Sequence, residues 1–164
     1  MFRPSVNLPL QASASLQYGS WNDLRFEGDI SGPLTADGAI TGRVVYANED
    51  KDSYLDHYSV NRNVFYGALA WDITPELKAT VGYSLQDNRA KGVLWGALPL
   101  TYSDGSFIDY DVSASTSADW TYWNVRDQSG FGELSYALGN GWEVRAIATY
   151  KRFDENAKLL YAFN

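Results

Sequence analysis

The stretch LKATVGYSLQ, residues 77–86, alternates between apolar and polar side chains along almost its whole length. Its apolar members are Leu77, Ala79, Val81, Tyr83 and Leu85. The polar residues between them are Lys78, Thr80, Ser84 and Gln86. A period of two residues is typical of a β-strand, because successive side chains point to opposite faces of the sheet. The stretch therefore predicts a strand with one apolar and one polar face.

The same alternation recurs along the rest of the chain. The further segments are 10–18, 24–30, 40–47, 64–73, 132–138, 142–150 and the beginning of another in KLLYAF, 158–163. These segments predict an all-β fold, an antiparallel up-and-down meander of about eight strands.

The connections between these segments are alternately short and long. Short turns with Gly, Pro or Asp occupy 31–38, 73–76 and 139–141. Longer polar connections occupy 48–62, 88–125 and FDENA, 153–157. Short turns therefore gather at one end of the predicted sheet and long loops at the other, where only the turn at 20–22 is short.

Composition excludes several classes of protein. A net charge of −7 argues against a nucleic-acid partner, because no basic surface is available to neutralise phosphates. The chain has no Cys and one His, His57, which argues against disulfides and against a His-rich metal site. Residues 1–11 lack the basic start and apolar run of a secretory signal, so we expect either a cytosolic protein or a piece whose export signal lies upstream.

Two architectures fit a meander with one apolar face. A soluble lipocalin-like binding barrel would bury the apolar face inside, whereas an outer-membrane barrel would turn it toward lipid around a polar interior. Charges of both signs on the polar face suit a hydrated interior; they are Arg25, Glu27, Asp29, Arg43, Lys78, Glu133, Glu143 and Arg145. Aromatic residues end the apolar faces, as in an interfacial girdle: Trp71, Trp142, Tyr18, Tyr46, Tyr83 and Tyr150. The pattern favours part of a transmembrane β-barrel.

Several short motifs stand in an order that resembles a known family. They are GSWND (19–23), SGPL (31–34), VFYG (64–67), WDITP (71–75), VGYSLQDN (81–88), WGALP (95–99), ADWTYW (118–123) and NGW (140–142). Their succession resembles the TonB-dependent outer-membrane siderophore receptors of the ferric-pyoverdine, ferric-coprogen and ferric-rhodotorulic-acid type. The resemblance covers essentially the whole chain, but only the N-terminal part of the family's barrel.

The resemblance implies how the chain is organised. Residues 1–9 would end a plug-like segment, with Val6–Asn7–Leu8 as its last strand, and residues 10–164 would form a partial barrel with long extracellular loops at 48–62 and 88–125. The eight strands could also close on themselves. A small eight-stranded outer-membrane barrel with a structural or adhesion role is therefore an alternative.

The resemblance also implies a function, namely TonB-energised uptake of a ferric siderophore across the outer membrane of a Gram-negative bacterium. The expected partners are the ferric siderophore, membrane lipid and, through parts absent from this chain, the TonB complex. Iron would be carried inside the siderophore, so no cofactor and no protein metal site are expected. No enzyme is expected either, since the sequence has no G-x-S-x-G motif and its single His lies in a loop.

The family places aromatic side chains around its ligand, and the matching positions here are Trp95 and Trp123. Trp120, Tyr122 and Tyr102 are further candidates for this siderophore wall. Aromatic rings offer a large contact area at a low cost in conformational entropy. The alternative is that these rings pack the loops together or lie in the membrane girdle.

Two groups of acidic residues predict structural roles instead. Asp104, Asp109 and Asp111 lack the spacing of a calcium-binding loop, so they predict a solvated turn. Glu133 and Glu143 predict ion pairs with Arg145 rather than a catalytic carboxylate pair.

Overall fold

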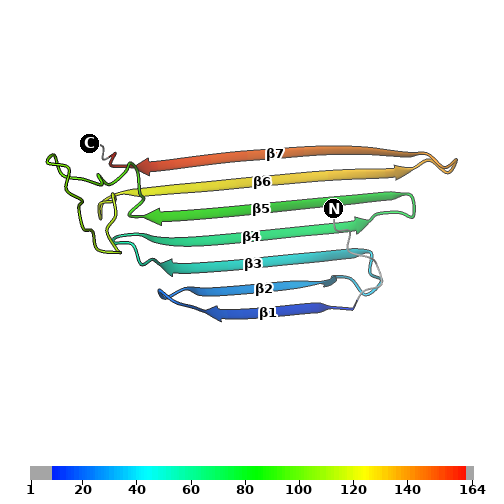
Figure 1. Cartoon of the computed structure of the whole chain (residues 1–164). Helices are drawn as coiled ribbons and strands as arrows, with labels where there is room; N and C mark the ends of the chain where they lie inside the picture. Colours follow the sequence, from blue (N-terminus) through cyan, green and yellow to red (C-terminus); the bar gives the residue numbers. More distant parts are fainter. Residues whose placement is uncertain (1–8, 162–164) are drawn as a thin grey trace.

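The computed structural model describes residues 9–161, which form one antiparallel sheet of seven strands in the order β1 to β7 (Figure 1). The strands are β1 (Gln11–Tyr18), β2 (Leu24–Pro33), β3 (Ile40–Asp52), β4 (Ser59–Asp72), β5 (Leu77–Lys91), β6 (Tyr122–Ala137) and β7 (Glu143–Lys158). Each strand pairs with its neighbour in sequence, which confirms the predicted all-β meander. Within the described range, no helix is long and apolar enough to cross a membrane.

The strands are longer at the long-loop end than the alternation predicted. The predicted loop 48–62 shrinks to 53–58, and the predicted loop 88–125 shrinks to 92–121. FDENA, 153–157, is not a connection but lies within β7. In these extensions polar residues replace most of the apolar ones on the apolar face, as at Asn48, Asp50 and Asp52 of β3, so backbone pairing continues where the apolar signal has ended.

The eighth predicted strand is not seen in the described residues. Strand β7 ends at Lys158, residues 159–161 are outside any strand, and residues 162–164 lie outside the described range. Strands β1 and β7 form the two edges of the sheet and are not paired with each other, so the seven described strands do not close as a barrel. The plug-like strand expected at Val6–Asn7–Leu8 also lies outside the described residues.

The apolar face of the sheet is uncovered. Leu69, Val81 and Leu134 expose 46%, 53% and 52% of their surface, and Trp71 exposes 49%. In the described part of the chain the only buried hydrophobic side chains are those of Val60 and Ala90. This arrangement contradicts the lipocalin-like alternative, because the large apolar side chains of this sheet do not gather in an interior.

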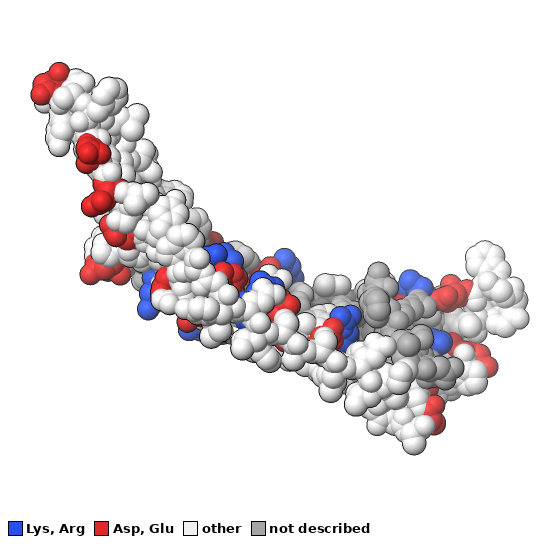
Figure 2. All heavy atoms as spheres, turned by 60° about the horizontal axis from the view of Figure 1, so that its bottom comes forward, with Lys and Arg blue, Asp and Glu red and all other residues white. Residues whose placement is uncertain are grey.

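The opposite face, called the charged face below, is crossed by ion pairs between neighbouring strands. Arg43 of β3 contacts Asp29 of β2 at 2.6 Å, and Lys151 of β7 contacts Asp127 of β6 at 3.0 Å. Arg145 lies 3.4 Å from Glu133 and 3.1 Å from Glu143, which confirms the predicted ion pairs. Basic and acidic atoms are interspersed along the middle of the sheet in Figure 2. Paired charges of this kind are compatible with a hydrated interior.

Candidate ligand site at the long-loop end

The two long loops, 53–58 and 92–121, lie together at one end of the sheet, at the left of Figure 1. Hydrogen bonds tie them to each other through Asp56. Its backbone N–H donates to the Ser113 carbonyl at 2.8 Å, and its carboxylate accepts from the Ser113 hydroxyl at 3.2 Å. The Ser117 hydroxyl donates to the Asp56 carbonyl at 3.1 Å. The loops therefore form one connected layer over the strand ends.

Trp95 and Trp123 meet in this layer, although they are far apart in sequence. Their ring centroids are 5.6 Å apart and the planes are inclined by 57°. Trp123 lies opposite Ala90 in the sheet register and is on the charged face, because strand alternation from Asp127 and Glu133 puts it there. Trp95 comes from loop 92–121 and is 42% exposed. The structure thus brings together the two principal residues of the predicted siderophore wall.

The indole nitrogen of Trp123 is buried and has no hydrogen-bond partner among the described residues. Buried donors in proteins are nearly always paired, since an unpaired one loses its bonds to water without compensation. The Trp95–Trp123 pair therefore combines an exposed ring with an unused donor.

The other predicted aromatic residues lie elsewhere. Tyr122 is on the apolar face, where its hydroxyl donates to Asn156 at 3.1 Å. Trp120 lies beside the same strand, with the Lys158 ammonium 5.1 Å from its ring centre. Tyr102 belongs to a separate turn in which its backbone N–H donates to the Ser106 carbonyl, and it is 59% exposed. The five predicted residues thus occupy three places.

The loop layer is acidic. Loop 92–121 contains Asp104, Asp109, Asp111 and Asp119 and has no Lys or Arg. Only acidic atoms are coloured at the upper left tip of Figure 2. The hydroxyl of Ser106 donates to the Asp104 carboxylate, as does the Ser106 backbone N–H, and these bonds lower the pKa of Asp104. Within residues 9–161, no group of three or more His, Cys, Asp or Glu side chains could hold a metal ion.

The single histidine, His57, is exposed in loop 53–58, with a φ of 69°. It has the surface-loop position that the sequence predicted. Its backbone carbonyl approaches Gly92 closely, since a Cβ added to Gly92 would lie 2.0 Å from that oxygen.

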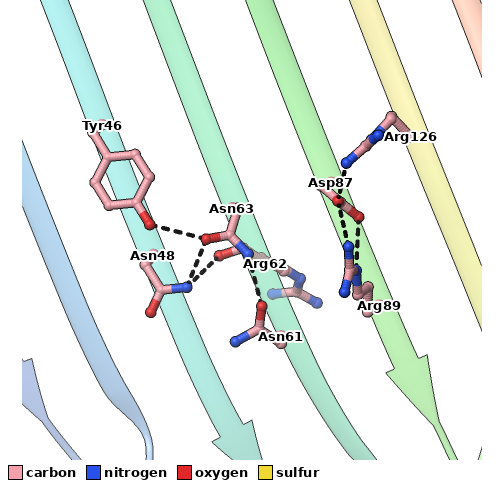
Figure 3. Close-up of polar contacts among 8 residues, drawn as sticks. All are labelled: Tyr46, Asn48, Asn61, Arg62, Asn63, Asp87, Arg89 and Arg126. Carbon is pink, nitrogen blue, oxygen red and sulfur yellow. Dashed lines mark hydrogen bonds and ion pairs between the residues drawn. The ribbon is translucent and has the colours of Figure 1, made fainter.

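Sequence reasoning missed a polar network on the apolar face, just beyond the aromatic residues (Figure 3). The Tyr46 hydroxyl donates to Asn63 at 3.0 Å, and Asn63 in turn donates to Asn61 at 2.7 Å. Asn48 donates to Asn63 and to the backbone carbonyl of Arg62. Asn48, Asn61 and Arg62 fall in the predicted loop 48–62, and Asn63 directly follows it. The feature of the sequence that could have revealed them is the period of two, which continues here among polar residues.

A second polar group, also drawn in Figure 3, joins β5 and β6. Asp87 accepts two hydrogen bonds from Arg89, at 3.2 and 3.1 Å, and one from Arg126 at 2.9 Å. The Asp87 side chain is only 12% exposed, whereas those of Arg89 and Arg126 are 60% and 47% exposed. The carboxylate therefore holds two outward-facing guanidinium groups side by side.

Known proteins resemble this chain in both sequence and structure. The ferripyoverdine receptor of Pseudomonas aeruginosa is 42% identical over 152 residues, which is 92% of this chain and 19% of that protein. The ferric-pyoverdine 358 receptor of Pseudomonas putida is 31% identical over 87% of this chain and 17% of its own length. The chain thus spans about a fifth of these curated relatives. No protein-family model matches it.

Solved structures agree with the sequence relatives. The outer-membrane ferripyoverdine receptor of P. aeruginosa, solved with ferripyoverdine bound, superposes with a TM-score of 0.86 at 36% identity, covering 96% of this chain and 21% of that one. The siderophore receptor PiuA of Acinetobacter baumannii shares the fold, with a TM-score of 0.72 at 14% identity over 92% of this chain and 22% of that one. These similarities confirm the resemblance predicted from the motifs: the chain is a homologue of one segment of the ferripyoverdine receptors.

Proposed function

We propose that this chain forms part of the wall of an outer-membrane receptor that takes up a ferric siderophore, energised by TonB in the intact protein. The observation that carries the proposal is 42% identity to a ferripyoverdine receptor across 92% of the chain. The two faces of the sheet support it. The uncovered apolar face suits contact with lipid, and the ion-paired charged face suits a water-filled interior.

The ligand wall of this segment is assigned to Trp95 and Trp123. The two rings lie on the charged face at the long-loop end, which is the side from which an extracellular ligand would enter. A flat siderophore chromophore can stack on the exposed Trp95 ring, and the Trp123 N–H beside it is a donor without an acceptor among the described residues. Iron would remain ligated by the siderophore.

The remaining aromatic candidates receive different roles in this proposal. Tyr122 and Trp120 lie on or beside the apolar face, in or next to the row of Lys91 and Lys158. They are assigned to the loop-side end of this face, beyond the girdle level that Tyr83 and Tyr150 mark. Tyr102 is exposed at a distal turn of loop 92–121 and would contact a ligand only at the outer rim.

Iron uptake by whole cells tests the proposal. The gene encoding the intact receptor is deleted, and uptake of radioactive iron supplied as ferripyoverdine is measured before and after the gene is returned. We expect uptake to fall on deletion and to recover on complementation. Unchanged uptake in the deletion strain, with the protein present at the surface of the parent strain, contradicts the proposal.

A further inference from the structure

Five basic side chains lie on the apolar face of β5–β7 at the long-loop end, spread along the strands from the row of Arg152 to the row of Lys158. They are Arg89, Lys91, Arg126, Arg152 and Lys158, and are called the basic cluster below. The register places them on one face, because Arg126 lies opposite Asp87 and Asp154, while Tyr122 lies opposite both Lys91 and Lys158. Arg152 lies opposite Gln128, which accepts a hydrogen bond from Tyr83 of the apolar face at 2.9 Å.

The basic cluster begins where the apolar surface ends. Tyr83 and Tyr150 are the last aromatic residues of this face on β5 and β7 and are 40% and 63% exposed. Arg152 follows Tyr150 by two residues, and the other four basic residues lie farther toward the long loops. Tyr residues mark the level of the lipid headgroups in membrane barrels. The cluster therefore stands at and above the headgroup level, on the side that faces lipid.

The local charge opposes that of the whole chain. In this part of the face, the acidic side chains on β5–β7 are Asp87 and Asp154, so five basic residues leave an excess of three positive charges. The chain as a whole carries −7. In the described part of the chain, no acidic side chain lies within 4.0 Å of the Lys91 or Lys158 ammonium group. Because the chain as a whole is acidic, its average composition does not account for a positive surface at this place.

The neighbouring strands show that hydration alone does not require these charges. In the matching rows of β3 and β4, the outward positions are Asn48, Asp50, Asp52, Asn63, Asn61 and Ser59, without a basic residue. Asn61 and Asn63 make a neutral network there. The same sheet thus meets water with amide, hydroxyl and carboxylate groups on β3–β4, whereas guanidinium and ammonium groups outnumber carboxylates on β5–β7.

The carboxylates of the cluster orient its guanidinium groups without covering them. Asp87 holds Arg89 and Arg126, while Asp154 accepts bonds from Arg152 at 2.8 and 3.0 Å. Arg152 remains 58% exposed. The guanidinium group of an arginine can donate two parallel hydrogen bonds to the oxygens of one phosphate group. The ammonium group of a lysine adds a compact positive charge.

We propose that the basic cluster binds the phosphate group of a lipid in the outer leaflet. The proposal rests on the proposed function for the orientation of the sheet in the membrane. Arg89, Arg126 and Arg152 would contact the phosphate oxygens. Lys91 and Lys158, which lie nearer the long loops, would raise the positive electrostatic potential that attracts the phosphate. The acyl chains of the lipid would lie along the uncovered apolar surface that includes Val81 and Tyr83.

The test uses the full-length receptor in detergent, with diphosphorylated lipid A as the probe. Binding is measured by native mass spectrometry at increasing salt for the parent protein and for the K91Q/K158Q variant. Among residues 9–161 neither lysine has an acidic side chain within 4.0 Å, so their removal leaves no carboxylate of this range unpaired. Lipid A affinity should fall by roughly fivefold for each lysine removed, and less so at high salt.

The matched control is K51Q/K151Q, which removes two lysines from the charged face of the same sheet. Lipid A binding should stay at the parent level in this control. An equal loss in both variants overturns the proposal, as does parent-level binding in K91Q/K158Q. A third variant, D87N/R89Q/R126Q, removes the arginine pair together with the carboxylate that holds it and should also weaken binding.

Two further arms identify the source of the phosphate. Lipid A stripped of its phosphates should bind weakly and equally to all variants; tight binding of this probe contradicts phosphate recognition. Inorganic phosphate alone should not bind at millimolar concentration, and saturation by it overturns the lipid assignment. Ferripyoverdine binding, measured on the same samples, should be the same in K91Q/K158Q as in the parent and reports separately on the proposed function.

Discussion

The carbonyl oxygen of His57 occupies the place where a side chain at Gly92 would begin, since an added Cβ would lie 2.0 Å from it. Gly92 also has a φ of 59° and donates its N–H to the Thr121 carbonyl at 2.9 Å. Loop 53–58 can therefore rest on the start of loop 92–121 only because residue 92 lacks a side chain.

A Gly92→Ala substitution in the intact receptor should separate the two loops. The left-handed backbone costs an alanine about 1–2 kcal/mol, and the clash with a backbone oxygen must move the loop as well. We expect faster proteolysis within loop 92–121 and weaker ferripyoverdine binding. Gly105→Ala is the control, because Gly105 has a φ of 85° but no atom within 4 Å of its added Cβ. Equal effects of the two substitutions would show that the contact with His57 is unimportant.

Removal of either ring of the Trp95–Trp123 pair should weaken binding of the ferric siderophore. By analogy with nucleobase stacking, one lost stacking contact costs about 1–3 kcal/mol, which is about 5- to 150-fold in Kd. Fluorescence titration of W95A and W123A with ferripyoverdine measures this change. W142A is the matched control, since Trp142 is 73% exposed at the short-turn end. Parent-level affinity in both W95A and W123A, with normal surface expression, contradicts the assigned wall.

Gly82 and Phe131 should be energetically coupled. They lie opposite each other on β5 and β6, and a Cβ at Gly82 would approach the Phe131 ring to 2.3 Å. Gly82→Ala should lower the thermal stability of the receptor, with a cost of about 1–3 kcal/mol as is usual for overpacking. In the F131A background the same change should cost much less, because the ring is gone. Gly132→Ala, with no atom within 4 Å, is the control; additive effects of G82A and F131A would disprove the coupling.

The turn at Asp104 should resist acid. The Ser106 hydroxyl and N–H hold the pKa of Asp104 below its usual value, so the bonds are fully present above about pH 4 and are lost as the pH falls through the lowered pKa. Ser106→Ala removes the hydroxyl, and the Asp104 pKa should rise toward the ordinary range. Carbon-13 NMR of the carboxyl groups follows this titration.

Asp37, in the turn between β2 and β3, is the internal reference for that experiment. Hydrogen bonds from Thr35 and Ala39 lower its pKa. Ser106→Ala should leave the Asp37 titration unchanged. A parallel shift of both carboxyl groups would indicate a general change in the protein rather than loss of one hydrogen bond.

The sequence predicted those features of the sheet that depend only on the alternation of side chains within one strand. Alternation in LKATVGYSLQ identified β5 and the apolar face that includes Val81 and Tyr83, because side-chain direction in a strand follows from the backbone of the strand itself. The ion pairs of Arg145 followed from the same parity. The ends of the strands did not: beyond Leu85 and Tyr150 the apolar face continues with polar residues, and pairing with a neighbouring strand keeps the backbone extended.

The aromatic site was also predicted in part. The family resemblance predicts both Trp95 and Trp123 in the ligand wall, and the structure brings their rings to 5.6 Å from each other. Tyr122 was grouped with them, although it lies on the other face and donates to Asn156. Its neighbour Trp123 lies on the charged face, so adjacent residues of one motif belong to opposite faces of the sheet.

By itself, the sequence determined that this chain forms amphipathic antiparallel strands and which residues share a face, because that information resides in a period of two along the backbone. Only the tertiary structure decided which side chains meet. The contact between His57 and Gly92, the Trp95–Trp123 pair and the basic cluster of β5–β7 each join residues from separate segments. Their proximity depends on sheet register and on the path of the loops, which are fixed by hydrogen bonds between strands rather than by the composition of any one of them.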